Sequence, residues 1–470
     1  MGVAATDWLD LPPATGWLTI IVSFSLVEPD MKRFVLASMT LSIMLLLPMT
    51  VTAQNASADW HAFIDAQTES RFDDIVEWRR HFHQHPELSN REFETAEYIA
   101  EFLRGLDIEV TTGVAHTGVV GVLVGGRPGP VVGLRADMDG LPVPSRAGLE
   151  FSPDVIGEYL GEEVPVSHAC GHDTHMAMLM GVAEMFAERR DELPGTVKFI
   201  FQPAEEGAPP GEEGGGELMV AEGVLQDPDV EVIFGQHIAS LMPVGMIGFR
   251  AGGIMAAADS FVITVNGKQT HGSTPWTGVD PIAVASQIVI GLNMIISRQT
   301  ELTKEAAVIS VGRVRAGVRN NIIPESAELI GTIRTLDTAM QDKIHDDIRR
   351  TVEHIALSFG ATAEVDIQRG YPVTYNDPEL TEMMAPTLER VGGDMTMRID
   401  AITGAEDFSF FQKEIPGVYF FTGGLPPGTD PSDAGPHHTP DFYIDEDGMR
   451  TGTRALASLA IDYMLMHADD

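Results

Sequence analysis

Apolar and polar positions alternate along the chain with two different periods. Short, almost wholly apolar runs predict strands buried on both faces, over residues 119–124, 131–134, 196–202 and 230–234. Apolar residues at helical spacing predict helices between them, over residues 59–82, 93–103 and 176–185. Ser89 and Glu92 match a capping box at the start of the second helix. Strands alternating with helices predict an α/β domain, whose ligands gather at the carboxyl ends of its strands.

The pattern changes near residue 252. An alternating strand, a helix, two strands, a helix and a last strand follow, over residues 259–268, 280–298, 307–314, 327–335, 338–359 and 362–368. We interpret residues 252–368 as an inserted α+β (ferredoxin-like) lid. A helix, a strand and a final helix return to the first domain, over residues 378–391, 417–421 and 445–467. The catalytic domain, with a mixed sheet, would then consist of residues 54–251 and 369–470.

The N-terminus resembles an export signal. Met31-Lys32-Arg33 precede an apolar run over residues 34–51, and small residues end the run at Ala53. We therefore expect a signal peptide over 31–53, a start-site over-extension over 1–30, and a periplasmic or secreted protein without a stable membrane anchor after cleavage. The alternative is one membrane anchor, for which this run is short. Mass spectrometry of the mature N-terminus separates the two, and an intact Met1 would contradict cleavage.

The net charge, chain length and cysteine content limit the possible partners, domains and cross-links of the chain. Acidic residues outnumber basic ones 69 to 30, and this formal charge of −39 argues against nucleic acid or anionic membrane as a partner. The 470 residues suffice for two or three domains. A single cysteine excludes an internal disulfide.

That cysteine, Cys170, lies in the stretch Ser-His-Ala-Cys-Gly-His-Asp-Thr-His over residues 167–175, directly before the apolar helix. A thiolate and an imidazole two residues apart, Cys170 and His172, can both bind zinc or a neighbouring first-row metal. The alternative is a buried free thiol beside surface histidines.

Further candidate ligands lie at other predicted strand or loop ends. Glu205 and Glu206 follow one strand, His237 follows the next, and His438 lies near the C-terminus beside His437. A histidine such as His237 is more often structural when taken alone. Cys170, His172, Glu206, His237 and His438 are too many for one tetrahedral site, but they suit two ions with one bridging group and open positions.

Several motifs in order resemble one family, the metallo-amidohydrolases that include hippurate hydrolases, N-acyl-amino-acid amidohydrolases and plant auxin-conjugate (IAA-amino-acid) hydrolases. The motifs are Pro-Glu-Leu-Ser (86–89), Arg-Ala-Asp-Met-Asp-Gly-Leu-Pro (135–142), His-Ala-Cys-Gly-His-Asp (168–173), Pro-Ala-Glu-Glu-Gly (203–207), His-Gly-Ser (271–273), Asn-Ile-Ile-Pro (321–324), Glu-Asp-Phe (406–408) and His-Thr-Pro (438–440). The resemblance covers residues 70 to 465.

The resemblance implies that Cys170 bridges two divalent ions, of zinc, manganese, cobalt or nickel. Glu206 and His438 would complete the shell of one ion, and His172 and His237 that of the other. Glu205 would be the general base that takes a proton from the water between the ions. The substrate would be a small N-acyl amino acid, hydrolysed to a carboxylic acid and a free amino acid.

Other residues receive supporting roles from the same resemblance. Lid His271 would stabilise the oxyanion, often across the interface of a homodimer formed through the lid. Asn321 and Arg334 would hold the substrate carboxylate. Asp139 would support the metal ligands, because Asp137 stands where carboxypeptidases of the wider superfamily have a ligand histidine.

Two other functions remain open from the sequence. A dipeptidase or carboxypeptidase on the same scaffold would share the metal ligands, since pocket walls set the acyl preference. A non-catalytic metal or peptide binder would have no need for Glu205.

Overall fold

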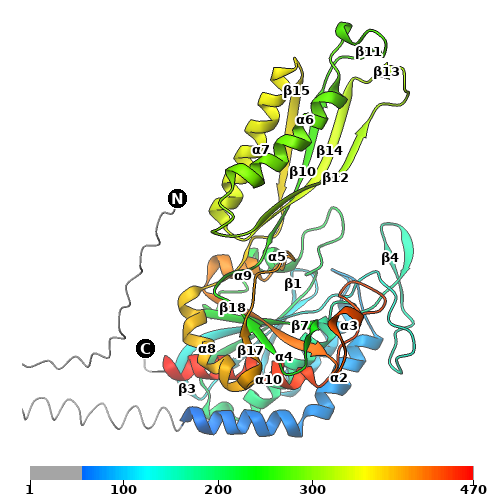
Figure 1. Cartoon of the computed structure of the whole chain (residues 1–470). Coiled ribbons are helices and arrows are strands. Elements are labelled where there is room, and N and C mark those ends of the chain that lie inside the picture. The colour runs from blue at the N-terminus through cyan, green and yellow to red at the C-terminus, as the bar shows by residue number, and fades with distance from the viewer. Residues whose placement is uncertain (1–55, 469–470) are drawn as a thin grey trace, which may run out of the picture. The chain divides into compact units, whose positions relative to one another are not determined.

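An eight-stranded mixed sheet forms the centre of the part of the chain that this computed structural model describes, residues 56–468 (Figure 1). In sheet order its strands are β1 (Glu109–Val114), β2 (Gly118–Val124), β6 (Pro194–Gln202), β3 (Arg127–Asp137), β7 (Val232–Pro243), β18 (Gly417–Leu425), β8 (Ile247–Phe249) and β17 (Thr396–Arg398). The four middle strands, β6, β3, β7 and β18, run parallel. Their carboxyl ends therefore meet at one edge. The segments predicted over 1–30 and 31–53 lie outside the described residues.

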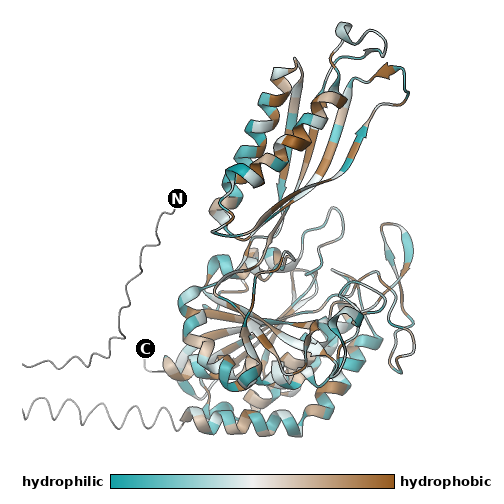
Figure 2. Cartoon of the chain, viewed as in Figure 1, coloured by the Kyte–Doolittle hydropathy of each residue, from teal (hydrophilic) through white to brown (hydrophobic). Residues whose placement is uncertain are grey.

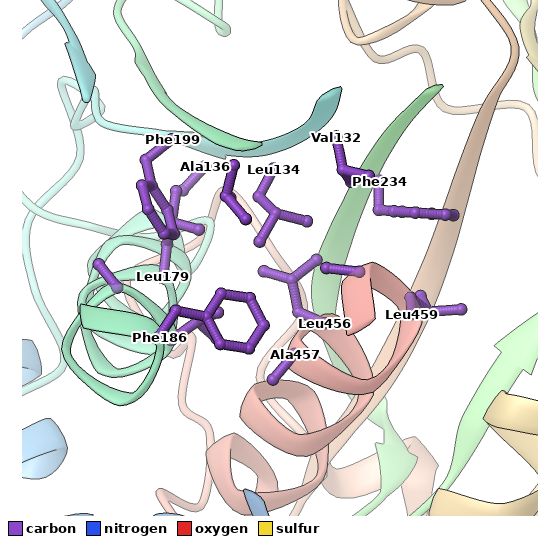
Figure 3. Close-up of a cluster of buried hydrophobic side chains, with 14 of the residues drawn as sticks. Val132, Leu134, Ala136, Leu179, Phe186, Phe199, Phe234, Leu456, Ala457 and Leu459 are labelled. Atoms are coloured by element: carbon purple, nitrogen blue, oxygen red, sulfur yellow. The ribbon is translucent and has the colours of Figure 1, made fainter. Parts of the chain in front are cut away.

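Helices cover both faces of this sheet. One face carries α2 (Phe72–Gln84), α3 (Phe93–Gly105), α4 (His172–Glu188), α8 (Pro378–Gly392) and α10 (Gly448–Met466), and the other carries α5 (Gly215–Ala221) and α9 (Ser409–Glu414). Figure 3 shows Leu134 of β3 and Phe234 of β7 packed against Phe186 of α4 and Leu456 of α10. Each such buried side chain contributes about 1.5–3 kcal/mol. The core thus fixes the helix that begins beside Cys170 onto the parallel strands.

The inserted unit is a second sheet with two helices. Its antiparallel strands are, in sheet order, β12 (Ala307–Ala316), β14 (Ser326–Thr335), β10 (Ala257–Asn266) and β15 (Thr362–Arg369). Its helices, α6 (Pro281–Met294) and α7 (Thr338–Ser358), bury residues such as Ile288 and Ile344 against this sheet. The ribbon β11 (Thr270–His271) with β13 (Ile322–Ile323) follows the far end of β10. Two short strands, β9 (Gly252–Met255) and β16 (Thr374–Asn376), pair where the chain enters and leaves the unit.

The predicted mixed α/β class is confirmed, while the domain boundaries stay a prediction. Three local predictions are wrong. The helix expected over 59–82 is interrupted by a turn at Arg71. β7 continues to Pro243 because β18 pairs with it that far, so His237 lies inside a strand and not at its end. The capping box does not form: the side chains of Ser89 and Glu92 bond to Asp139 and to the turn before Glu205 instead.

Candidate metal centre

Five predicted ligands meet at the carboxyl edge of the parallel strands. Cys170 lies in the loop before α4, His172 is the first residue of α4, Glu206 follows β6, His237 lies within β7, and His438 follows β18. Their donor atoms form two groups that share the thiol, Cys170 with His172 and His237, and Cys170 with Glu206 and His438. Within each group the donor atoms lie within 4.8 Å of one another. The fold therefore assembles the two ligand sets that the family resemblance implies.

Gly171 allows Cys170 and His172 to face the same site. Its φ of +106° lies in the left-handed region that favours glycine. A Cβ atom at this position would lie 2.6 Å from Ile238 Cγ2, on β7. A side chain at residue 171 would therefore push the start of α4 away from β7.

The rings of His172 and His237 are oriented as metal ligands usually are. Nδ1 of His172 donates to the Asp139 carbonyl oxygen at 2.9 Å, and Nδ1 of His237 donates to the Ile238 carbonyl oxygen at 2.6 Å. Nε2 of His172 is buried without a hydrogen-bond partner among the described residues, and it lies 3.7 Å from Glu205. Nε2 of His237 lies 3.4 Å from Cys170 Sγ. Such second hydrogen bonds fix the tautomer and leave Nε2 free for a metal.

The contacts of the ring nitrogens show which of His437 and His438 can bind a metal. Both ring nitrogens of His437 are used, because Nε2 accepts from the Ser240 amide at 3.1 Å and Nδ1 donates to the Cys170 carbonyl oxygen at 3.0 Å. Nε2 of His438 instead lies 3.0 Å from Glu206 Oε1 and 3.3 Å from Cys170 Sγ. His438 also has a φ of +63°, a strained conformation of the kind that clusters at functional sites. His438 is the ligand candidate of the two.

Two further groups at this edge have supporting positions. His175 donates from Nδ1 to Asp137 at 2.6 Å and accepts the Ile238 amide at Nε2, so neither nitrogen is free for a metal. The Asp139 carboxylate accepts the amides of Glu205 and Glu206 at 3.1 and 3.0 Å. Asp139 does not line the cavity described below. It holds the two glutamates in place.

Burial and neighbouring carboxylates raise the pKa values of two groups in the centre, Cys170 and Glu205. Burial, followed by the carboxylates of Glu206, Glu205 and Asp137, raises the pKa of the Cys170 thiol well above its usual value. Burial and the carboxylates of Glu406, Glu206 and Asp407 likewise raise the pKa of Glu205. Divalent cations among these groups would reverse both shifts and keep the thiol ionised. Thiolate, imidazole and carboxylate are suitable donors for such cations, so the residues present fit two metal ions.

Sequence reasoning missed three residues that complete the centre. Arg135 is fully buried and pairs with Asp137 at 2.7 Å and with Glu406 and Asp407 at 2.9 Å each. Glu92 accepts the Ala204 amide, and burial together with Asp139 raises its pKa to about 8. Tyr371 donates to the Glu205 carbonyl oxygen at 2.6 Å. A signal existed for Arg135 alone, since an arginine at the end of a buried strand demands buried carboxylates.

The two residues predicted to hold the substrate carboxylate, Asn321 and Arg334, lie far apart within one chain. Asn321 adjoins the ribbon of β11 and β13, whereas Arg334 pairs with Ala258 at the opposite end of the lid sheet. Arg334 lies eight positions after Ser326 along β14, a distance of roughly 26 Å in an extended strand. Asn321 and Arg334 of one chain are therefore too far apart to hold one carboxylate together. His271, beside Asn321, is exposed, and its Nδ1 accepts the Ser273 amide at 3.0 Å. Nε2 of His271 therefore carries the proton and can donate it.

A cavity of about 510 Å³ opens onto the candidate ligands. Cys170, Glu205, Glu206, His237 and His438 line one side of it. The other lining residues are mostly apolar and include Ile238, Leu241, Met242, Met255, Ile399, Ile402 and Phe421, and the polar side chains of Glu406 and His437 join them. Among the described residues, no lysine or arginine lines this space. The cavity therefore offers a largely apolar surface without a basic side chain next to the ligand cluster.

Comparisons with known proteins agree with this geometry. The model of peptidase family M20/M25/M40 matches residues 133–462. Thermostable carboxypeptidase 2 of Saccharolobus solfataricus is 41% identical over 83% of this chain and 95% of that protein. N-acetylcysteine deacetylase of Bacillus subtilis is 37% identical over 82% of this chain and 96% of that protein. The Bacillus subtilis YXEP protein, whose structure is described as a dinuclear metal-binding peptidase of the M20 family, is 34% identical, with a TM-score of 0.71 over 84% of this chain and 99% of that one.

Proposed function

The chain belongs to peptidase family M20/M25/M40 and is a hydrolase of amide bonds, and on that premise we propose that it cleaves N-acyl and N-aroyl amino acids to a carboxylic acid and a free amino acid. The proposal includes two divalent ions bridged by Cys170, and Glu205 as the general base.

The apolar wall of the cavity is the observation that carries the choice of substrate. Met255, Ile402 and Phe421 line the same space of about 510 Å³ as Glu205 and the candidate ligands. A benzoyl or branched acyl group would remove apolar surface from water there, at about 25 cal/mol per Å². A charged acyl group would meet no lysine or arginine among the described lining residues. The wall thus favours a neutral, bulky acyl group.

The residues divide the chemistry between them. When bound, the two ions would acidify a shared water molecule and polarise the scissile carbonyl. Glu205 would accept the proton of that water and deliver it to the nitrogen of the leaving amino acid. Asp139 orients Glu205 through its amide, and His271 would donate from Nε2 to the developing oxyanion.

A carboxypeptidase is the second candidate, because a relative that is 41% identical carries that name. Both reactions release a free amino acid, so the metal ligands do not separate them. They differ in the group on the acyl side of the bond, a carboxylic acid in one and a peptide in the other.

A substrate panel on metal-loaded protein tests the choice. We expect kcat/KM for N-benzoyl and branched N-acyl amino acids to exceed that for N-succinyl amino acids by at least about tenfold, since one well-buried apolar group is worth 1.5–3 kcal/mol. Faster cleavage of N-blocked dipeptides would favour the carboxypeptidase. Binding of an acyl amino acid without any product would favour the non-catalytic binder.

We propose further that two copies pair through the lid. β12 is a terminal strand of its sheet, and no described strand pairs with its outer edge. Ile282, Ile290 and Met294 of α6, the helix beside it, are exposed apolar residues at a spacing of eight and four residues. Figure 2 shows hydrophobic segments along this helix. Such an edge and face suit a second copy related by a twofold axis. A partner copy could also bring its Asn321 to Arg334, which one chain cannot do.

Replacing Ile290, which is 53% exposed, by glutamate tests this pairing. We expect the wild type to sediment as a dimer and I290E as a monomer, because the charge would have to be buried. Activity should fall at least about tenfold if each centre needs the partner copy. Leu357→Glu, on an exposed position of α7, should leave the dimer intact. A monomeric wild type with full activity would contradict the proposal.

A further inference from the structure

The turn that carries Glu205 is held in place by hydrogen bonds from three successive backbone amides. Ala204 has a φ of +53°, a conformation that a residue with a side chain adopts only at a cost. Its amide donates to Glu92 at 2.9 Å. The next two amides, of Glu205 and Glu206, donate to the two oxygens of Asp139. The donor side of the turn is thus fixed by buried carboxylates.

The acceptor side of this turn is held by Tyr371. Its hydroxyl donates to the Glu205 carbonyl oxygen at 2.6 Å. Its ring packs edge-on against Phe410, with the centroids 6.1 Å apart. The peptide plane between Glu205 and Glu206 is therefore held by Tyr371 on one side and by Asp139 on the other. Rotation of that plane would swing the Glu205 carboxylate away from its place.

Tyr371 also belongs to the connection between the lid and the catalytic sheet. β15, the last strand of the lid, ends at Arg369, two residues before Tyr371. The Tyr371 carbonyl oxygen accepts the amide of Ala258, the second residue of β10, by which the chain enters the lid sheet, at 2.9 Å. One residue thus contacts both connecting segments and the turn that carries Glu205.

We propose that Tyr371 is a positioning residue that holds Glu205 in its productive orientation and ties that orientation to the lid connection. The proposal rests on the proposed role of Glu205 as the general base. A proton acceptor acts only within hydrogen-bond reach of its proton, and a misplacement of about 1 Å can lower a rate by about 100-fold. The hydroxyl of Tyr371 touches neither the substrate cavity nor a candidate metal ligand's side chain in the described contacts. Its effect would therefore pass through the Glu205 peptide.

Tyr371→Phe removes the hydroxyl and keeps the ring against Phe410. We expect kcat to fall about 10- to 100-fold while KM changes less than about twofold, because binding of the substrate is left intact. The metal content and the absorption spectrum of the cobalt-loaded protein should equal those of the wild type. Tyr375→Phe, at a tyrosine of β16 that is 46% exposed, is the matched control and should change neither constant. An unchanged kcat, or a loss of metal, would overturn the proposal.

A double-mutant cycle tests whether the effect passes through Glu205. In a Glu205→Asp background the carboxylate is already displaced, so adding Tyr371→Phe should lower kcat by less than about twofold. Independent, multiplicative losses would overturn the proposal. Glu205→Gln with wild-type activity would instead refute the base itself, so the failure of the proposed mechanism is distinguishable from the failure of the Tyr371 link.

Discussion

Replacing Glu205 by glutamine should lower kcat by about 10²- to 10⁴-fold and leave two metal ions bound per chain. The substitution keeps the size of the side chain and removes its ability to accept a proton. Glu205 is buried, 5% exposed, and lies 3.7 Å from the free Nε2 of His172, so it faces the ligand cluster. Steady-state kinetics of metal-loaded protein, with metal analysis of the same samples, measures both quantities.

Glu212→Gln is the matched control for this prediction. Glu212 lies in the same loop between β6 and α5, but its partners are Arg91, near the surface, and Asn90. Its replacement should leave kcat within about twofold, as surface substitutions usually do. Loss of metal from the Glu205→Gln protein would make Glu205 a ligand, and wild-type turnover would remove it from the mechanism.

A sequence pattern predicts best those helices and strands that are buried evenly along their length. β3 and β6 are buried along most of their length, and α4 is apolar on all sides, so their composition alone indicated them. The four long strands and two helices of the lid were predicted in order, whereas the two-residue strands β11 and β13 were missed. β7 was predicted too short because its second half pairs with β18, a strand about 180 residues later. A local pattern contains no information on such a partner.

Cys170 and His172 could be predicted because the single thiol lies two residues from an imidazole, whereas the assignment of Glu206, His237 and His438 to two ions rested on the family resemblance. The supporting residues could not be predicted. The sequence around Ser89 and Glu92 matched a helix cap. In the structure the Glu92 carboxylate instead accepts hydrogen bonds from the Thr117 hydroxyl and the Ala204 amide. Only the fold shows that these side chains point away from their own helix. Likewise, Asn321 and Arg334 looked like one pair until the register of β14 placed them at opposite ends of a sheet.

The buried charges of the centre explain why one arginine matters for stability. Arg135 faces Asp137, Glu406 and Asp407, all of them almost completely buried. Burial raises the pKa of Asp407 to about 8, although Arg135 acts to lower it. Without the guanidinium, these carboxylates would have to stay charged without compensation or take up protons.

Arg135→Met should therefore lower the free energy of unfolding by about 3–5 kcal/mol, the cost of leaving buried charges without a partner. The folded-state pKa of Asp407 lies above its unfolded value and would rise further in the variant, so protonation favours the folded state at low pH. The loss in free energy of unfolding, relative to the wild type, should therefore be largest above pH 8 and should shrink as the pH falls towards 5. Urea unfolding of metal-free protein at several pH values measures it.

Arg398→Met gives the contrast that makes this prediction specific. Arg398 also pairs with a carboxylate, Glu382, and lies over the Phe249 ring as Arg135 lies over the Phe408 ring, but its side chain is 50% exposed. Exposed pairs of this kind are worth about 0–1 kcal/mol. Equal losses for the two variants would show that the carboxylates around Arg135 obtain their compensation elsewhere. A larger loss for Arg135→Met at high pH would identify this arginine as the cation that allows the acidic centre to fold before metal binds.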